Sequence, residues 1–165
     1  MNELHLAYLS LGSNIEPEVN LPKAVELLSQ HGKIEKISSA WETEPVGGEG
    51  GNYLNACLSY KTTLSRDELK TEIIHPIESN RGRKRTADKN APRTIDIDII
   101  LFDDEIVGGR WLAQTFVVVP LAEIHPDFQN PTSHESIAET ATRLRREFWT
   151  ETRRGILNRP AGSSE

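Results

Sequence analysis

Apolar residues near the start of the chain recur at the two-residue period of β-strands. Residues 4–14 (LHLAYLSLGSN) predict a strand that ends in a Gly-Ser-Asn turn. Residues 32–45 and 52–64 are rich in strand-forming side chains and predict two neighbouring strands. The glycine-rich loop that joins them, residues 45–52, is a candidate lid.

Helical spacing of apolar residues predicts three helices. The first follows the start signals Asn20 and Pro22. The second opens at a capping box formed by Ser65 and Glu68, and Pro76 is expected to kink or terminate it. The apolar positions that define the three helices are Leu21, Ala24, Val25 and Leu28; Leu69, Ile73 and Ile77; and Ile137, Ala141, Leu144 and Phe148.

Two later segments predict further strands. In residues 94–101 (TIDIDIIL) apolar and polar side chains alternate, which is typical of a strand with one buried face. The predicted buried face carries Ile95, Ile97, Ile99 and Leu101, and the other face carries Thr94, Asp96 and Asp98. Residues 115–126 (TFVVVPLAEIHP) predict a short strand that breaks at Pro120 into a turn of helix.

These elements favour an α+β sandwich, in which helices cover a mixed or antiparallel sheet. The chain has 165 residues, enough for one domain with a real core, and it shows no internal repeat or linker. We expect a single domain over residues 1–155 and a flexible tail over residues 156–165.

Composition narrows the class of protein. A hydrophobic fraction of 36%, a charged fraction of 27% and a net charge of −6 describe an acidic globular chain without a bulk positive charge for nucleic acid or membrane. The sequence has no apolar run of membrane-spanning length, and an acidic residue stands where a signal peptide carries positive charge, so we expect a cytoplasmic protein. Cys57 is the single cysteine, which excludes an internal disulfide and favours a small strand residue.

Asp96 and Asp98 are the first candidates for chemistry. On a strand their side chains lie about 7 Å apart on the same face, where like charges repel unless a cation neutralises them. Two oxygen ligands at this spacing suit Mg²⁺, whose remaining positions are usually filled by water and substrate phosphates. A solvated face of an edge strand is the simpler alternative.

A basic stretch runs directly into this strand. Within residues 81–93 it carries Arg81, Arg83, Lys84, Arg85, Lys89 and Arg93, opposed only by Asp88. A solvated loop or a nucleic-acid patch would also explain it. Cations for phosphate oxygens followed by carboxylates for Mg²⁺ are, however, the combination that phosphoryl transfer requires. The sequence has no Walker loop or GxGxxG motif, so the site must be of another type.

At this point the chain resembles a known family, the 6-hydroxymethyl-7,8-dihydropterin pyrophosphokinases (HPPK). The segment APRTIDIDIILF resembles the family's Pro-Arg-x-x-Asp-x-Asp motif. In chain order, the resemblance extends to AYLSLGSNI, SSAWETEPVG, NYLNA, IESNRGRKR and FVVVPLAEIHP. It covers residues 7–128.

The resemblance implies a ferredoxin-like α+β fold and a diphosphotransferase that moves pyrophosphate from ATP to the pterin hydroxymethyl group, releasing AMP, in folate biosynthesis. It implies that Asp96 and Asp98 hold two Mg²⁺ ions, with ATP as co-substrate, and that catalysis is mainly positioning and electrostatics. The residues implied at the nucleotide are Glu78, Arg83, Arg85, Arg93 and Ile99, and those implied in catalysis are Arg83, Arg93, Asp96 and Asp98.

The resemblance also implies a pterin site. Asn55 matches the residue that hydrogen-bonds the edge of the ring, since an amide both donates and accepts. Tyr53 and Phe116 match an aromatic pair that sandwiches the flat heterocycle. Thr43 and Val46 match a segment that supplies main-chain contacts.

The chain departs from the family before Phe116. The family carries a Pro-His pair and then an arginine, both directed at the triphosphate, whereas this segment is shortened and has Gln114 in the arginine's place. Arg110, with Trp111, remains to reach the nucleotide. Three readings stay open: an active pyrophosphokinase, a related transferase with another pterin-like substrate, and a degenerate binding protein.

The expected partners are therefore small molecules, ATP and 6-hydroxymethyl-7,8-dihydropterin, bound by a monomer without nucleic acid or membrane. A hypothesis from another class remains. The basic stretch and an arginine-rich late helix could serve a nucleic-acid or protein partner, and a steep fall of RNA or DNA affinity with salt would support it.

Overall fold

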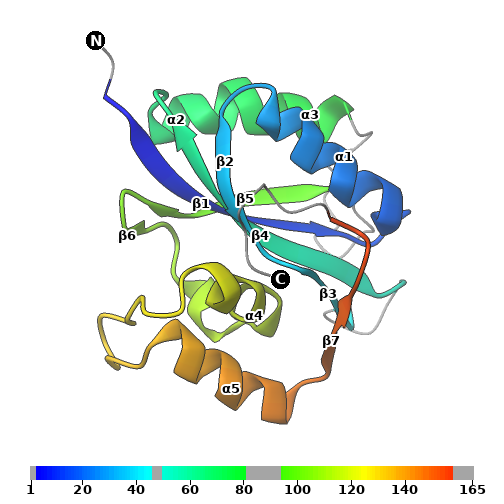
Figure 1. Cartoon of the computed structure of the whole chain (residues 1–165), viewed down its shortest axis with the longest axis vertical. Coiled ribbons are helices and arrows are strands. Elements are labelled where there is room, and N and C mark those ends of the chain that lie inside the picture. Colours follow the sequence, from blue (N-terminus) through cyan, green and yellow to red (C-terminus); the bar gives the residue numbers. More distant parts are fainter. Residues whose placement is uncertain (1–2, 46–49, 81–93, 158–165) are drawn as a thin grey trace.

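The computed structural model describes residues 3–45, 50–80 and 94–157, which form an antiparallel sheet with helices on both sides (Figure 1). The strands lie in the order β6-β5-β1-β4-β3-β7, and β2 pairs with β4. Their bounds are β1 His5–Ser13, β2 Lys33–Ile37, β3 Ala40–Thr43, β4 Tyr53–Thr62, β5 Asp96–Phe102, β6 Glu105–Ile106 and β7 Thr150–Arg153.

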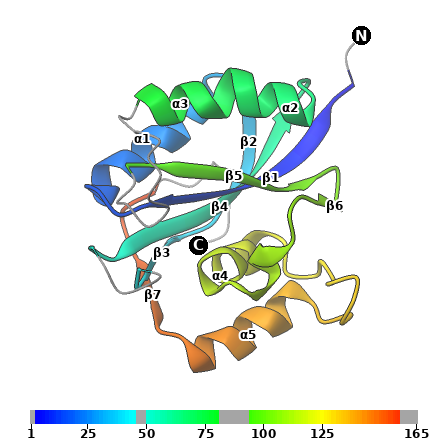
Figure 2. The ribbon, with the colours of Figure 1, turned by 180° about the vertical axis from the view of Figure 1, so that it is seen from behind.

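Two groups of helices cover the two faces of the sheet (Figure 2). The first group comprises α1 Pro17–Ser29, α2 Arg66–Glu68, the π-helical segment η1 Leu69–Ile74 and α3 His75–Asn80. The second comprises the 3₁₀ segment η2 Arg110–Ala113, α4 Thr115–Ile124 and α5 Ile137–Glu147. This arrangement confirms the predicted α+β sandwich. No helix in the described part of the chain is long and apolar enough to cross a membrane.

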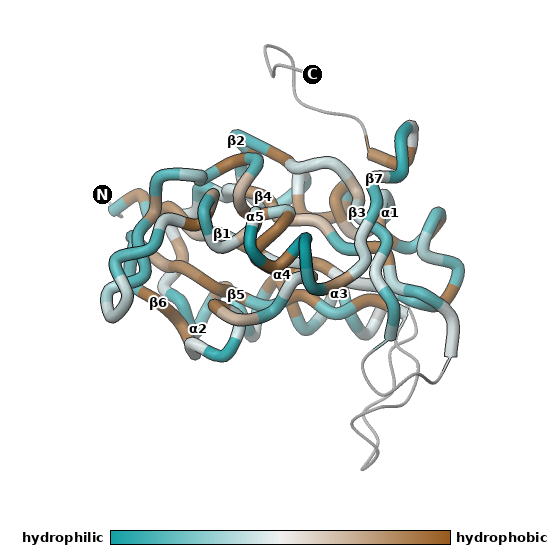
Figure 3. The backbone as a smooth tube through the Cα atoms, turned by 90° about the horizontal axis from the view of Figure 1, so that it is seen from below, coloured by the Kyte–Doolittle hydropathy of each residue, from teal (hydrophilic) through white to brown (hydrophobic). Residues whose placement is uncertain are grey.

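Strand alternation divides the core into two clusters. On β1, Leu9 and Leu11 pack into the first core cluster, beneath α1, η1 and α3, whereas Tyr8 packs into the second, beneath α4 and α5. Both clusters consist mainly of apolar side chains, so burial of apolar surface is the main contribution that holds each helical group on the sheet. In Figure 3, α4 is largely apolar, and α5 mixes apolar and hydrophilic residues because only one of its faces is buried.

A β-bulge corrects the predicted face of Leu101. In the pairing with β1, Leu9 faces Ile99 and Tyr8 faces Leu101, so Ile100 is an extra residue on β5. An extra residue reverses the alternation beyond it. Ile99 therefore packs against the first core cluster as predicted, but Leu101 lies in the second, on the face that carries the aspartates.

The helix after Ser65 was expected to kink or to end at Pro76; it does not end there, because α3 continues to Asn80. Its capping box is present, with Ser65 Oγ accepting from the Glu68 amide. The helix then widens over η1, where the amide of His75 donates to the carbonyl of Lys70, five residues earlier. This wider turn accommodates a proline, which lacks an amide hydrogen and would clash in a regular α-helix, so the chain stays helical to Asn80.

One predicted helix start and one predicted strand were wrong. α1 begins at Pro17 rather than after Asn20, because proline is favoured at the first helical position, and Pro22 lies inside the helix. Thr115–Ile124 form helix α4, so the short strand predicted before Pro120 is wrong, although a turn of helix was expected after it. Its valines favour strands, but burial between the sheet and α5 outweighs that preference.

The end of the described chain differs from the prediction in two respects. Phe148 does not continue the buried face of α5: it is 54% exposed, because the helix ends at Glu147. The chain then forms β7, which pairs with β3, and Ile156 and Leu157 pack partly buried against the first core cluster. Residues 158–165, the rest of the expected tail, lie outside the described residues.

Candidate active site

A row of paired residues crosses four strands on the face covered by α4. In the antiparallel register, Trp41 of β3 pairs with Asn55 of β4, Asn55 pairs with Gly12 of β1, and Gly12 pairs with Asp96 of β5. Side chains in register on one sheet face are neighbours. The sheet therefore brings the predicted pterin residue Asn55 and the predicted metal ligand Asp96 into one line.

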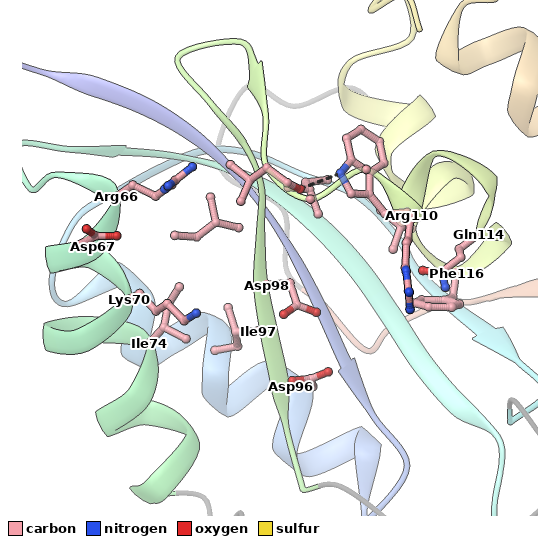
Figure 4. A pocket seen from close by; sticks show the side chains of 17 residues that line it. Arg66, Asp67, Lys70, Ile74, Asp96, Ile97, Asp98, Arg110, Gln114 and Phe116 are labelled. Atoms are coloured by element: carbon pink, nitrogen blue, oxygen red, sulfur yellow. Dashed lines mark hydrogen bonds between the residues drawn. The ribbon is translucent and has the colours of Figure 1, made fainter. Parts of the chain in front are cut away.

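The two aspartates face an open pocket of about 1040 Å³ that curves around the edge of β5 (Figure 4). Asp96 is half-buried and Asp98 is exposed, so both carboxylates are accessible from the pocket. Ile99, which the resemblance implies at the nucleotide, also lines it. The edge is open here because β6 pairs with β5 only at Leu101 and Phe102.

These carboxylates fit Mg²⁺, although they are too few to enclose it. Within the described residues no group of three or more His, Cys, Asp or Glu side chains could hold a metal ion. Mg²⁺ does not require such a cage, because one or two carboxylates together with water and substrate phosphates complete its octahedron. The donor set of Asp96 and Asp98 is thus suited to a metal that arrives with a phosphate substrate.

Glu78 supports the strand that carries the two aspartates from behind. It is 3% exposed, and its carboxylate accepts a hydrogen bond of 3.0 Å from the amide of Ile97, between the two aspartates. No strand of the described chain pairs with β5 on that side at Ile97, so the carboxylate takes the place of a neighbouring strand. The contact between Glu78 and the nucleotide stays a prediction.

The predicted pterin residues on the sheet lie two and three strands away from the aspartates, on β4 and β3. Asn55 and Thr43 are buried, and Asn55 Nδ2 donates to Thr43 Oγ1 at 2.7 Å. Tyr53, half-buried, pairs in register with Thr43. Among these residues of the described chain, Phe116 alone lines the open pocket, so the aromatic sandwich stays a prediction.

Glu123 ties the helix that carries Phe116 to β3 and the residue before it. Its carboxylate accepts from the indole N–H of Trp41 and from the amide and hydroxyl of Ser39, both at 3.1 Å. The guanidinium of Arg145 lies over the face of the Trp41 ring, 5.0 Å from the ring centroid. These contacts fix α4 against β3, which sets the position of Phe116 relative to Thr43.

The shortened segment forms the wall of the pocket opposite η1. Gly108 and Gly109 have φ angles of 80° and 146°, and they lead into η2. Arg110 is exposed and reaches the pocket beside Phe116, with Gln114 next to it (Figure 4). Trp111 lines the pocket as well, but it is 6% exposed and its indole N–H donates to a main-chain carbonyl, so packing is its main role.

Three polar residues of the pocket were missed by sequence reasoning. Arg66, Asp67 and Lys70 project from α2 and η1, on the other side of β5 from Arg110 (Figure 4). The capping box at Ser65 locates their helix in the sequence, and the charged residues in the first turns of that helix are the signal that could have found them. Their position gives the pocket cations on both walls.

Cys57 lies under the same face but is no candidate nucleophile. It is fully buried, and burial raises the pKa of its thiol, so the side chain stays neutral. This confirms the sequence interpretation of a small strand residue. Four predicted site residues, Val46, Arg83, Arg85 and Arg93, lie outside the described residues, as do residues 46–49 of the candidate lid.

Comparison with known proteins identifies relatives of the chain. Residues 8–126 match the family described as 7,8-dihydro-6-hydroxymethylpterin-pyrophosphokinase (HPPK). The chain is 38% identical, over 142 residues, to the 2-amino-4-hydroxy-6-hydroxymethyldihydropteridine pyrophosphokinase of Aquifex aeolicus (strain VF5), covering 80% of this chain and 88% of that one. The Bacillus subtilis (strain 168) protein of the same name is 41% identical over 132 residues, with coverages of 73% and 78%.

Solved structures share the fold. The HPPK-DHPS protein of Plasmodium falciparum with STZ-DHP has a TM-score of 0.71 at 12% identity, covering 87% of this chain and 46% of that chain. An HPPK-DHPS in complex with substrates has a TM-score of 0.66 at 14% identity, with coverages of 88% and 44%. This chain thus spans less than half of those chains, and the likeness confirms the expected ferredoxin-like fold.

The family match over residues 8–126 includes all of β5, the strand that carries Asp96 and Asp98. Because the family model matches most of the chain and both relatives are similar to it over most of their length, the chain belongs to the HPPK family, whose enzymes transfer pyrophosphate from ATP to hydroxymethyldihydropterin.

Proposed function

We propose that this chain performs the HPPK reaction in the pocket beside β5, with Asp96 and Asp98 as the ligands of two Mg²⁺ ions. The observation that supports this best is the row in which Asn55, Gly12 and Asp96 are paired across three strands. Two strand spacings of about 4.8 Å separate Asn55 from Asp96, roughly 10 Å in all. That separation suits a bicyclic ring anchored at β4 whose hydroxymethyl arm extends to β5.

The aspartates and arginines would position the triphosphate. Bound Mg²⁺ supplies charge neutralisation and a template for the phosphate oxygens. Asp96 and Asp98 would hold the Mg²⁺ ions at the nucleotide end of the pocket. Arg83, Arg85 and Arg93 would bind phosphate oxygens through charge-assisted hydrogen bonds. Arg110 provides a further cation from the shortened segment. The pterin hydroxyl oxygen then bonds to the β-phosphorus while its proton passes to solvent. The bond from that phosphorus to the α,β-bridging oxygen breaks, the electron pair stays on that oxygen, and AMP leaves.

The pterin would lie against β3 and β4. The Asn55 amide bonds the edge of the ring, Thr43 and Val46 contribute main-chain contacts, and Tyr53 and Phe116 stack on its two faces. Two hydrogen bonds on this face support the arrangement: the bond that Asn55 donates to Thr43, and the bond that Trp41 donates to Glu123, which fixes the helix carrying Phe116.

The test is pterin-dependent formation of AMP from MgATP by the purified protein. We expect turnover by the wild type and loss of at least a hundredfold for Asp96→Asn and for Asp98→Asn, with unchanged unfolding temperatures. Asp127→Asn, at an exposed aspartate beyond the end of α4, is the matched control and should keep full activity. Retained turnover in either β5 variant would contradict the metal assignment. If the wild type binds pterin but forms no AMP, the protein with its shortened segment has lost the transferase activity.

The localisation, the oligomeric state and the binding partners of the protein are also proposals. We infer a cytoplasmic monomer that binds only its two small-molecule substrates. Cell fractionation and light scattering of the purified protein test these points separately, and a stable dimer at micromolar concentration would contradict the second.

A further inference from the structure

Gly12 occupies the centre of the row that joins the proposed pterin residue to the proposed metal ligand. It pairs with Asn55 of β4 on one side and with Asp96 of β5 on the other. Its strand β1 lies between those two strands (Figure 1). Its backbone is not among the positive-φ positions of the described chain, so no turn or left-handed conformation requires a glycine here. The reason for glycine at this position must be space above the sheet.

A side chain at Gly12 would collide with the Asn55 amide. A Cβ built on Gly12 lies 2.9 Å from Asn55 Oδ1, 3.8 Å from Tyr53 Cδ2 and 4.0 Å from Asn55 Cγ. The three nearest atoms thus all belong to two residues of the proposed pterin site. The first distance is shorter than a van der Waals contact, so Asn55 would have to move.

Asn55 has little freedom to move. It is 3% exposed, and its Nδ2 donates to Thr43 Oγ1 at 2.7 Å, which fixes the plane of the amide. Rotating the carboxamide away from an alanine at position 12 would break or bend this buried bond. The amide can lie over β1 with its present orientation only because Gly12 has no side chain.

We propose that Gly12 is a positioning residue for substrate recognition: its missing side chain lets the Asn55 amide lie over β1 with the orientation that a planar aminopyrimidinone ring requires. The inference rests on the proposed role of Asn55. Hydrogen bonds to a ring edge depend on amide orientation, so a shift of a few tenths of an ångström weakens pterin binding while leaving the nucleotide end of the pocket intact.

The experiment compares Gly12→Ala with Gly32→Ala and with Asn55→Ala. Gly32 is the matched steric control, because its Cβ would lie 2.5–2.8 Å from the ring of Tyr60, in the first core cluster and away from the site. We expect Gly12→Ala to raise the KM for pterin about tenfold and to change the KM for ATP less than twofold. Gly32→Ala should lower the unfolding temperature without changing the ratio of the two KM values.

A double variant separates positioning from general damage. In the Asn55→Ala background the clashing amide is gone, so adding Gly12→Ala should cause no further loss of pterin affinity. If Gly12→Ala alone fails to fold, folding of the double variant supports the inference, and failure of both overturns it.

The remaining outcomes distinguish the inference from the proposed function. A wild-type KM for pterin in Gly12→Ala, together with a raised KM in Asn55→Ala, overturns the inference and leaves the pterin site standing. An undiminished cost of Gly12→Ala in the double variant also overturns it, because the sheet rather than the amide would then be affected. Wild-type pterin affinity in Asn55→Ala contradicts the proposed site itself, and the inference falls with it.

Discussion

Thr43→Val should weaken pterin binding without disturbing the strand that carries Thr43. Valine keeps the branched shape that suits β3 but replaces the hydroxyl that accepts from Asn55 Nδ2 at 2.7 Å. Both residues are buried, at 6% and 3% exposure, so water cannot readily replace the lost acceptor. The main-chain contacts that we propose for this segment are unaffected.

The magnitude follows from the buried amide donor that is left unsatisfied. Such a donor costs about 1–3 kcal/mol of the free energy of unfolding. For a protein of this size that corresponds to roughly 2–10 °C in unfolding temperature. An amide that is no longer held in one orientation should also weaken pterin binding by about 1–2 kcal/mol, or roughly five- to thirtyfold in Kd.

Two measurements check this prediction. Urea unfolding of the free protein gives the stability change, and calorimetric titration of pterin in the presence of a non-hydrolysable MgATP analogue gives the Kd. Thr62→Val is the control: Thr62 is buried on β4 and its hydroxyl accepts from the Leu64 amide at 3.1 Å, far along the strand from Asn55. It should lose stability but keep the wild-type Kd. A Thr43→Val variant with unchanged stability and a Kd within twofold of wild type would refute the reasoning.

Two further predictions concern charge. Arg110→Ala should lower kcat/KM for ATP by roughly 10- to 150-fold, since a charge-assisted hydrogen bond contributes about 1.5–3 kcal/mol; an equal loss in Arg146→Ala, an exposed arginine of α5, would argue against a phosphate contact. Hydrogen bonds from Asn52 and then Arg153 hold the pKa of Glu42 below its ordinary 4.5, so its stabilising contribution is complete above that pH and is lost as the pH falls through the lowered pKa. Unfolding temperatures between pH 6 and 3 should therefore fall less steeply for Glu42→Gln, and parallel curves would contradict the assignment.

Local patterns were sufficient where a residue's role depends on its near neighbours in the chain. The capping box at Ser65 and the alternation that sets Asp96 and Asp98 on one face are both present in the structure. A capping hydrogen bond joins residues three apart, and strand alternation is a property of the backbone, so both can be recognised in the sequence.

Local patterns failed where a distant contact reversed a local preference. The valines of residues 115–126 favour a strand, yet they form α4 because the sheet and α5 bury them on several sides. Leu101 changed faces because one bulge, defined only by pairing with β1, shifted the alternation. The wider turns of η1 accommodate Pro76, and the presence of a proline in the sequence does not by itself predict such turns.

The sequence by itself determined the chemistry of this protein: the carboxylate pair, the basic stretch that precedes it, and the resemblance that links them to pyrophosphoryl transfer. These are properties of residue type and spacing, which the chain carries without folding. Only the tertiary structure decided that Asn55, Gly12 and Asp96 share one row, since the register of three antiparallel strands distant in sequence places them there. The role proposed for Gly12 also depends on the tertiary structure, because only the folded chain shows that the Asn55 amide occupies the space where a side chain at position 12 would lie.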